Sequence, residues 1–117
     1  MKKIAMNSLV FVVAVVGMVC PAFAHAHLSS SNPQANSTVH GPAVAIDLKF
    51  DSRVDSARSH LDLVMPNGKI ESLKITALSN AELGSHATLT PGKYAIRWQA
   101  LSVDGHITRG EIPFTVQ

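Results

Sequence analysis

The fold class is decided by one stretch, Lys93-Tyr94-Ala95-Ile96-Arg97-Trp98-Gln99-Ala100. Large apolar residues alternate here with polar ones, so Tyr94, Ile96 and Trp98 share one face of an extended segment while the charged and amide side chains point away. The stretch from Ala43 to Phe50 repeats this alternation, with its large apolar side chains on one face. Both stretches are therefore predicted to be strands that bury one side and expose the other to solvent.

Turn residues separate further segments of the same kind. His60 to Met65 alternates similarly, and Pro66-Asn67-Gly68 turns the chain into a strand near Lys69 to Thr76, which predicts a hairpin. The last strand carries apolar residues at alternate positions, Ile112, Phe114 and Val116. Pro113 within it cannot donate a backbone hydrogen bond, which indicates either an edge position or an outward, unpaired amide.

These strands are short, and the sequence shows no internal repeat or domain linker. About seven strands in a domain of this size predict an all-β fold, a small Greek-key β-sandwich or barrel. A helical turn is predicted in one of two segments, Ser56 to His60 or Ala81 to His86.

The beginning of the chain has the features of a secretory signal peptide. A pair of lysines forms a positive start, Leu9 to Val19 form a short apolar stretch, and Ala22-Phe23-Ala24 supplies small residues at a cut site. The apolar stretch is about half of the roughly 20 residues needed to cross a bilayer. We therefore expect residues 1–24 to be removed and residues 25–117 to form one soluble domain without membrane insertion.

Removal of this leader changes the charge and the cysteine content. The full sequence has 10 basic and 8 acidic residues, and the leader holds two lysines and no acidic residue, so the mature chain is expected to be neutral. A neutral chain without a basic stripe argues against nucleic acid as a partner.

The single cysteine, Cys20, also lies in the leader, so disulfides, thiolate zinc sites, cysteine nucleophiles and blue-copper centres are excluded from the mature chain. The alternative, lipoprotein attachment at Cys20, is disfavoured by the bulky Val19 before it.

Cleavage after Ala24 makes His25 the first residue of the mature chain. Its α-amino nitrogen and its imidazole can then close one chelate ring around a metal ion. Asp104 and His106 lie two positions apart and project to the same side of an extended segment, although such a pair alone is more often a turn aspartate beside a surface histidine. An amine, two imidazoles and a carboxylate suit Cu(II), while zinc accepts the same donors in a tetrahedral arrangement.

The remaining histidines and the methionine content bear on the same prediction. Cleavage after Ala26 is the alternative, and it makes His27 the terminus; with cleavage after Ala24, His27 is expected to be an accessory group near the metal. Met65 is the only methionine after the leader and is interpreted as core filler, so no Cu(I) site is predicted. Residues not expected to act as ligands are His40, His60 and His86, the core aromatic Trp98, and the surface charges Arg97 and Arg109.

Several segments together carry a family resemblance. They are His25-Ala26-His27-Leu28-Ser29-Ser30-Ser31-Asn32-Pro33, the strand beginning at Pro42, the Pro91-Gly92-Lys93-Tyr94 turn, Trp98, and Ser102-Val103-Asp104-Gly105-His106 with Gly110 and Phe114. Over nearly the whole mature chain they resemble the CopC copper-resistance family. The resemblance implies a periplasmic, cupredoxin-like (immunoglobulin-like) Greek-key β-barrel that binds one Cu(II) through the amine and ring of His25, Asp104 and His106.

The resemblance also implies a role in copper tolerance or uptake, without enzymatic turnover and often beside an inner-membrane protein of the CopD family. Some family members carry a methionine-rich loop for Cu(I), and the region from Met65 to Thr76 departs from them in having no methionine cluster. Two other classes remain open. One is a histidine-brace copper monooxygenase, since lytic polysaccharide monooxygenases use the same amine and imidazole chelate. The other is a metal-free β-sandwich module, which leaves a histidine at the cut site unexplained.

Overall fold

The computed structural model describes residues 25–117; the predicted leader, residues 1–24, and Cys20 lie outside the described residues. The described part is all-β, as predicted, but it has nine strands where about seven were expected, together with one 3-10 turn. In chain order the elements are β1 (Leu28–Asn32), β2 (Ser37–Val39), β3 (Ala43–Phe50), η1 (Ser56–Arg58), β4 (His60–Val64), β5 (Ile70–Leu73), β6 (Thr76–Ser79), β7 (Glu82–Thr88), β8 (Gly92–Leu101) and β9 (Ile107–Val116). Within this part, no helix has the length and apolar character needed to cross a membrane.

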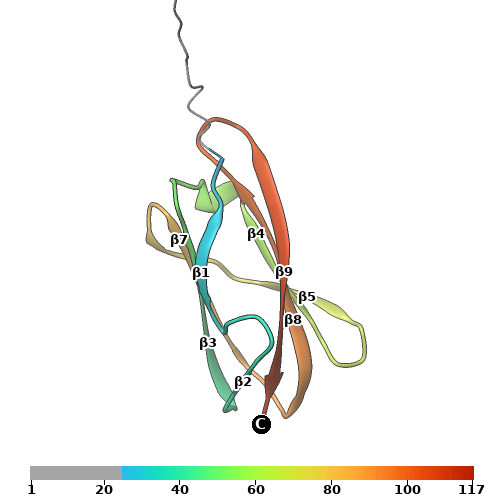
Figure 1. The fold of residues 1–117 in the computed structure, drawn as a ribbon. Helices are drawn as coiled ribbons and strands as arrows, with labels where there is room; N and C mark the ends of the chain where they lie inside the picture. Colours follow the sequence, from blue (N-terminus) through green and yellow to red (C-terminus); the bar gives the residue numbers. More distant parts are fainter. Residues whose placement is uncertain (1–24) are drawn as a thin grey trace, which may run out of the picture.

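The strands form two sheets that pack against each other as a sandwich (Figure 1). One sheet has the order β1-β3-β7-β6, and the other has the order β2-β9-β8-β4-β5. The pairing of β2 with β9 is parallel, whereas the pairs on both sides of β3 and of β8 are antiparallel. Because β1 and β2 belong to different sheets, the chain crosses from one sheet to the other soon after its first strand.

The longest hairpin, β8–β9, determines where the candidate site lies. Its two strands pair along their whole length, and the turn at residues 102–106 joins them at one end of the sandwich. The predicted inward face of β8 is confirmed, because its alternate residues are all buried: Tyr94, Ile96, Trp98 and Ala100. The hairpin predicted at Pro66-Asn67-Gly68 is also present, since β4 pairs antiparallel with β5.

Aromatic side chains fill the space between the sheets. Phe50 meets Trp98 edge to face with ring centroids 5.4 Å apart, and Tyr94 stacks on Phe114 at 5.8 Å. The Tyr94 hydroxyl donates to the Thr90 carbonyl at 2.7 Å, which satisfies the polar end of the ring. The prediction that Trp98 is a core residue is therefore confirmed.

Trp98 lies directly against a glycine of the neighbouring strand. Gly110 faces Trp98 in the β8–β9 register, and a Cβ atom at Gly110 would lie 2.5 Å from the indole ring. The indole can occupy this place because glycine has no side chain to displace it.

The helical turn expected in one of two segments is found in the first, because η1 (Ser56–Arg58) lies within Ser56 to His60. The other segment, Ala81 to His86, belongs mostly to β7, which pairs with β3 over seven residues. Only Leu83 and Gly84 of β7 are fully buried, so the strand lacks the apolar alternation that identifies β3. The strand expected near Lys69 to Thr76 is divided between two elements. β5 ends at Leu73 in the five-stranded sheet, and β6, which starts at Thr76, is an edge strand of the four-stranded sheet.

Pro113 lies in an interior strand, so the edge position suggested by the sequence is wrong. Its carbonyl accepts a hydrogen bond from the Asn36 N–H at 2.6 Å on the side of β2. The backbone nitrogen of a strand residue points to the same side as its carbonyl, and β2 pairs with β9 only from Ser37 onward. The missing N–H of Pro113 therefore interrupts no hydrogen bond to β8. This agrees with the second alternative given by the sequence, an amide position that points outward and is unpaired.

Candidate metal centre

The turn between β8 and β9 carries two of the three predicted ligands. The Ser102 N–H donates to the His106 carbonyl at 2.8 Å, and the Gly105 N–H donates to the Ser102 carbonyl at 2.9 Å. Gly105 has a φ of 94°, a left-handed conformation that glycine adopts without steric cost. Ser102 also forms a β-bridge with Val54, which anchors the base of the turn. The turn is thus a closed loop that presents the side chains of Asp104 and His106 together.

Donors on two sides hold the Asp104 carboxylate. The Ser102 hydroxyl, on a residue only 2% exposed, donates to Oδ1, and the His106 N–H donates to the same oxygen at 3.2 Å. The other oxygen, Oδ2, lies 2.9 Å from His106 Nδ1. The Ser102 hydroxyl above all, and then the bonds to His106, lower the pKa of Asp104 well below the usual carboxyl range, against an opposing effect of desolvation. Asp104 is therefore ionised at neutral pH, the form that binds a metal.

Replacing Ser102 with alanine is expected to raise the pKa of Asp104 toward the ordinary value of 3.8. A carboxyl group with a lowered pKa stabilises the fold above 3.8 and loses that contribution as the pH falls toward its folded-state pKa. Part of the stability difference between wild type and Ser102→Ala should therefore disappear on acidification. Urea unfolding of the metal-free protein from about pH 7 to about pH 2 measures this difference, and NMR titration of the Asp104 carboxyl carbon measures the pKa. An unchanged Asp104 titration in Ser102→Ala would assign the shift to other donors.

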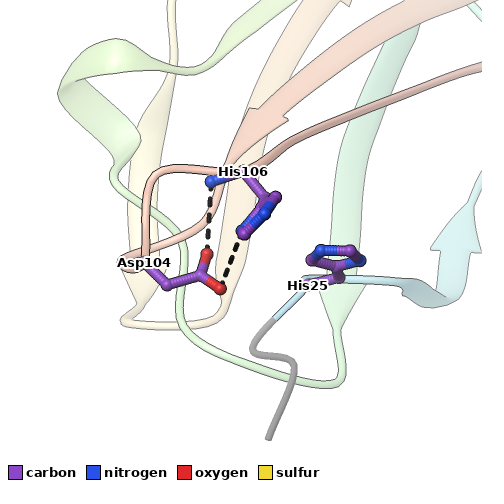
Figure 2. A group of neighbouring side chains, drawn as sticks. All are labelled: His25, Asp104 and His106. Atoms are coloured by element: carbon purple, nitrogen blue, oxygen red, sulfur yellow. Dashed lines mark hydrogen bonds and ion pairs between the residues drawn. The ribbon is translucent and has the colours of Figure 1, made fainter. Parts of the chain in front are cut away.

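His25 reaches this turn from the opposite end of the described chain (Figure 2). Its ring centroid is 4.2 Å from that of His106, with the ring planes inclined by 55°. One donor atom each from His25, Asp104 and His106 lies within 4.8 Å of the other two. Ligands at bond lengths of about 2 Å from one ion are at most about 4 Å apart, so a contraction of less than about 1 Å would enclose an ion. The structure thus brings all three predicted ligand residues together.

His27 lies beside this group and faces a different carboxylate. Its ring centroid is 6.2 Å from that of His25, and its Nδ1 is 3.5 Å from Asp51 Oδ2. The His27 N–H donates to Asp51 Oδ1 at 2.7 Å, and the Asp51 N–H donates to the His27 carbonyl at 2.9 Å. Asp51 follows β3, so these bonds attach the N-terminal segment to the four-stranded sheet.

Residues assigned by the sequence to the surface or the core lie where they are expected. Three histidines are exposed and stand outside the metal-compatible group of residues 25–117: His40, His60 and His86. Arg97 Nε lies 3.4 Å from Glu111, and Arg109 Nε donates to Gln99 at 2.8 Å, so both arginines make ordinary surface contacts. Met65 is partly buried and packs against the core, as its interpretation as core filler requires.

Three further residues support the group through hydrogen bonds, and the sequence pattern does not single them out: Ser102, Asp51 and Thr108. Ser102 does carry a signal, because serine side chains commonly make local hydrogen bonds in turns. Asp51 and Thr108 carry none. Their partners His27 and Ala26 are 24 and 82 positions away, and the fold alone brings them together.

Comparison with known proteins gives a consistent family assignment. The model of the CopC domain family matches residues 28–117. Protein YobA of Escherichia coli strain K12 is 33% identical over 102 residues, which cover 81% of this chain and 81% of that protein. Copper resistance protein C of Xanthomonas campestris pv. juglandis is 32% identical over 106 residues, which cover 82% and 83% of the two chains.

A solved structure extends the similarity to the fold. The crystal structure of CopC from Methylosinus trichosporium OB3b superposes with a TM-score of 0.71 at 31% identity, covering 80% of this chain and 94% of that one. The family match includes β1, the whole β8–β9 hairpin and the turn that holds Asp104 and His106. The chain therefore belongs to the CopC family.

Proposed function

We propose that the mature chain begins at His25 and binds one Cu(II) ion as a periplasmic carrier or buffer in copper homeostasis. The convergence of His25, Asp104 and His106, whose donor atoms lie within 4.8 Å of one another, is the observation that carries this proposal. Once the leader is removed, the α-amino nitrogen of His25 adds a fourth donor. A relative named for copper resistance supports copper as the ion.

The donor set favours Cu(II) over other common ions. One amine, two imidazoles and one carboxylate offer nitrogen-rich tetragonal coordination, and divalent affinities place copper above nickel and zinc. Soft donors for Cu(I) are not available in the described residues, since Met65 packs against the core. The His106 and Asp104 side chains are 57% and 29% exposed, so an ion can enter and leave the site from solvent.

Delivery of copper to a membrane protein of the CopD family is also part of this proposal. Val103 and Ile107 flank the ligand-bearing residues of the turn and are 60% and 47% exposed. Exposed apolar side chains beside a metal site offer an acceptor protein a surface on which to dock. A copper-transfer assay that compares wild type with Val103→Ser tests this part, because equal transfer rates would remove Val103 from the docking surface.

Titration of Cu(II) into protein with a mass-verified N-terminus at His25 is expected to give one tightly bound ion per chain. Electron paramagnetic resonance should show a single tetragonal centre with several nitrogen donors. His106→Ala should weaken binding by roughly a hundredfold or more, because the loss of even an outer partner of a metal ligand costs about 10–100-fold. His86→Ala removes an exposed histidine outside the group and is the matched control. Equal losses in both variants would contradict the ligand assignment, and no binding by the wild type would favour the metal-free module.

A histidine-brace monooxygenase is the competing function, because it shares the chelate. Polysaccharide-cutting enzymes of that kind present aromatic side chains on a broad substrate surface. Within residues 25–117, every phenylalanine, tyrosine and tryptophan is buried: Phe50, Tyr94, Trp98 and Phe114. Their burial favours a binding protein without turnover. Copper-loaded protein given a reductant and oxygen should leave polysaccharides uncut, and the release of oxidised oligosaccharides would support the enzyme instead.

A further inference from the structure

One hydrogen bond joins the two segments that carry the candidate ligands. The Thr108 hydroxyl donates to the Ala26 carbonyl at 2.8 Å, and Ala26 itself is completely buried. Ala26 directly follows His25, and Thr108 comes two residues after His106. The bond therefore links the residue next to one candidate ligand with a residue two positions from another.

The geometry of an extended chain explains why this contact brings the two imidazoles together. His106 directly precedes β9, and its carbonyl accepts a hydrogen bond from the Ser102 N–H at 2.8 Å, which continues the pairing of the hairpin. Alternate residues of an extended segment project to the same side, so we place Thr108 on the same side as His106. When Thr108 holds the Ala26 carbonyl, the preceding residue, His25, is kept beside His106. The ring separation of 4.2 Å agrees with this placement.

A second attachment acts one residue further along. Asp51 holds the backbone of His27 through two hydrogen bonds at the end of β3. Asp51 adjoins the four-stranded sheet and Thr108 belongs to the five-stranded one, so residues 25–27 bridge the two sheets. Asp51 alone would hold His27 and leave the direction of the two preceding residues open.

We propose that Thr108 is a positioning residue whose hydroxyl presets the N-terminal segment, so that the His25 chelate forms against Asp104 and His106. The consequence for metal affinity rests on the proposed copper function. The contact itself belongs to the protein without metal. A segment that is ordered before the ion arrives loses less conformational entropy on binding.

Two substitutions at Thr108 separate its hydroxyl from its shape. Thr108→Val keeps the β-branched form and removes the donor, whereas Thr108→Ser keeps the donor. In metal-free protein that begins at His25, nuclear Overhauser effects between the His25 and His106 ring protons should weaken or vanish in Thr108→Val and persist in Thr108→Ser. Competition with a chelator should show Cu(II) affinity lowered roughly tenfold in Thr108→Val, because the buried Ala26 carbonyl loses its hydrogen bond. The Thr108→Ser protein should bind Cu(II) as the wild type does.

A matched control and three outcomes decide the proposal. Thr115→Val makes the same change near the other end of β9, and it should alter neither the ring contact nor the affinity. If the Thr108→Val protein keeps the ring contacts and the Cu(II) affinity of the wild type, the proposal is wrong. It is also wrong if the Thr108→Ser protein binds Cu(II) as weakly as the Thr108→Val protein, since the shape of the Thr108 side chain would then matter and its hydroxyl would not. If the wild type binds no copper, the proposed function fails, and the ring contacts in the metal-free variants still decide the role of Thr108.

Discussion

One extra residue in front of His25 is expected to weaken Cu(II) binding by roughly a hundredfold or more. Even the loss of a residue that only hydrogen-bonds to a metal ligand lowers metal affinity about 10–100-fold. In the protein with the additional residue, the backbone nitrogen of His25 is part of an amide, which lacks the basic lone pair of an amine. The chelate ring then cannot form as proposed, and the ion keeps the imidazoles and the carboxylate. Chelator competition measures the affinity, and electron paramagnetic resonance should report fewer nitrogen donors.

A third protein that starts at His27 completes this comparison. It lacks the His25 ring that lies 4.2 Å from His106, so it should bind more weakly than the chain that starts at His25. Stronger binding by the shorter chain would move the amine ligand to His27 and the cleavage site to Ala26. Equal Cu(II) affinity of the protein with the additional residue and the protein that starts at His25 would show that the amine is not a ligand.

Gly110→Ala is expected to destabilise the protein by about 1–3 kcal/mol, the usual cost of overpacking a core. The new Cβ would lie within 2.7 Å of three indole atoms of Trp98, including one at 2.5 Å. The indole cannot yield easily, because it is 7% exposed and packs against Phe50. Differential scanning calorimetry should show the midpoint of unfolding lowered by more than about 4 °C in a domain of this size.

Gly84→Ala is the matched control for this substitution. A Cβ at Gly84 would lie 2.7 Å from Leu78, which is nearly as close, but Leu78 is a flexible side chain that is 53% exposed. Leu78 can rotate into solvent, so the loss of stability should be clearly smaller. Equal losses at the two glycines would show that the rigidity of Trp98 is not the cause.

The strands that could be predicted are those with a long apolar alternation. β3 and β8 show it over most of their length, because one face of each lies in the core. β7 could not be recognised, because Gly84 and Ser85 interrupt its apolar pattern and its pairing with β3 decides its conformation. The place of Pro113 in an interior strand depends on how far β2 extends, which no local pattern encodes.

The candidate ligands could be predicted because each carries a local signal. His25 follows a predicted cut site, and Asp104 and His106 have the spacing of a pair on one side of an extended segment. The contacts that hold these residues in place are different in kind. The bond from Thr108 to Ala26 spans 82 positions, and its existence depends on the packing of both sheets.

The position of the candidate ligands also bears on how the fold resists unfolding. His25 precedes β1 of one sheet, and Asp104 and His106 precede β9 of the other. An ion held by all three would cross-link the two sheets and close a loop that contains most of the described chain, much as a disulfide does. Because the unfolded chain does not hold these residues together, each tenfold rise in free ion above the Kd adds about 1.4 kcal/mol to the free energy of unfolding. A domain without a cysteine among its described residues would thus gain a cross-link that forms and dissolves with the supply of metal.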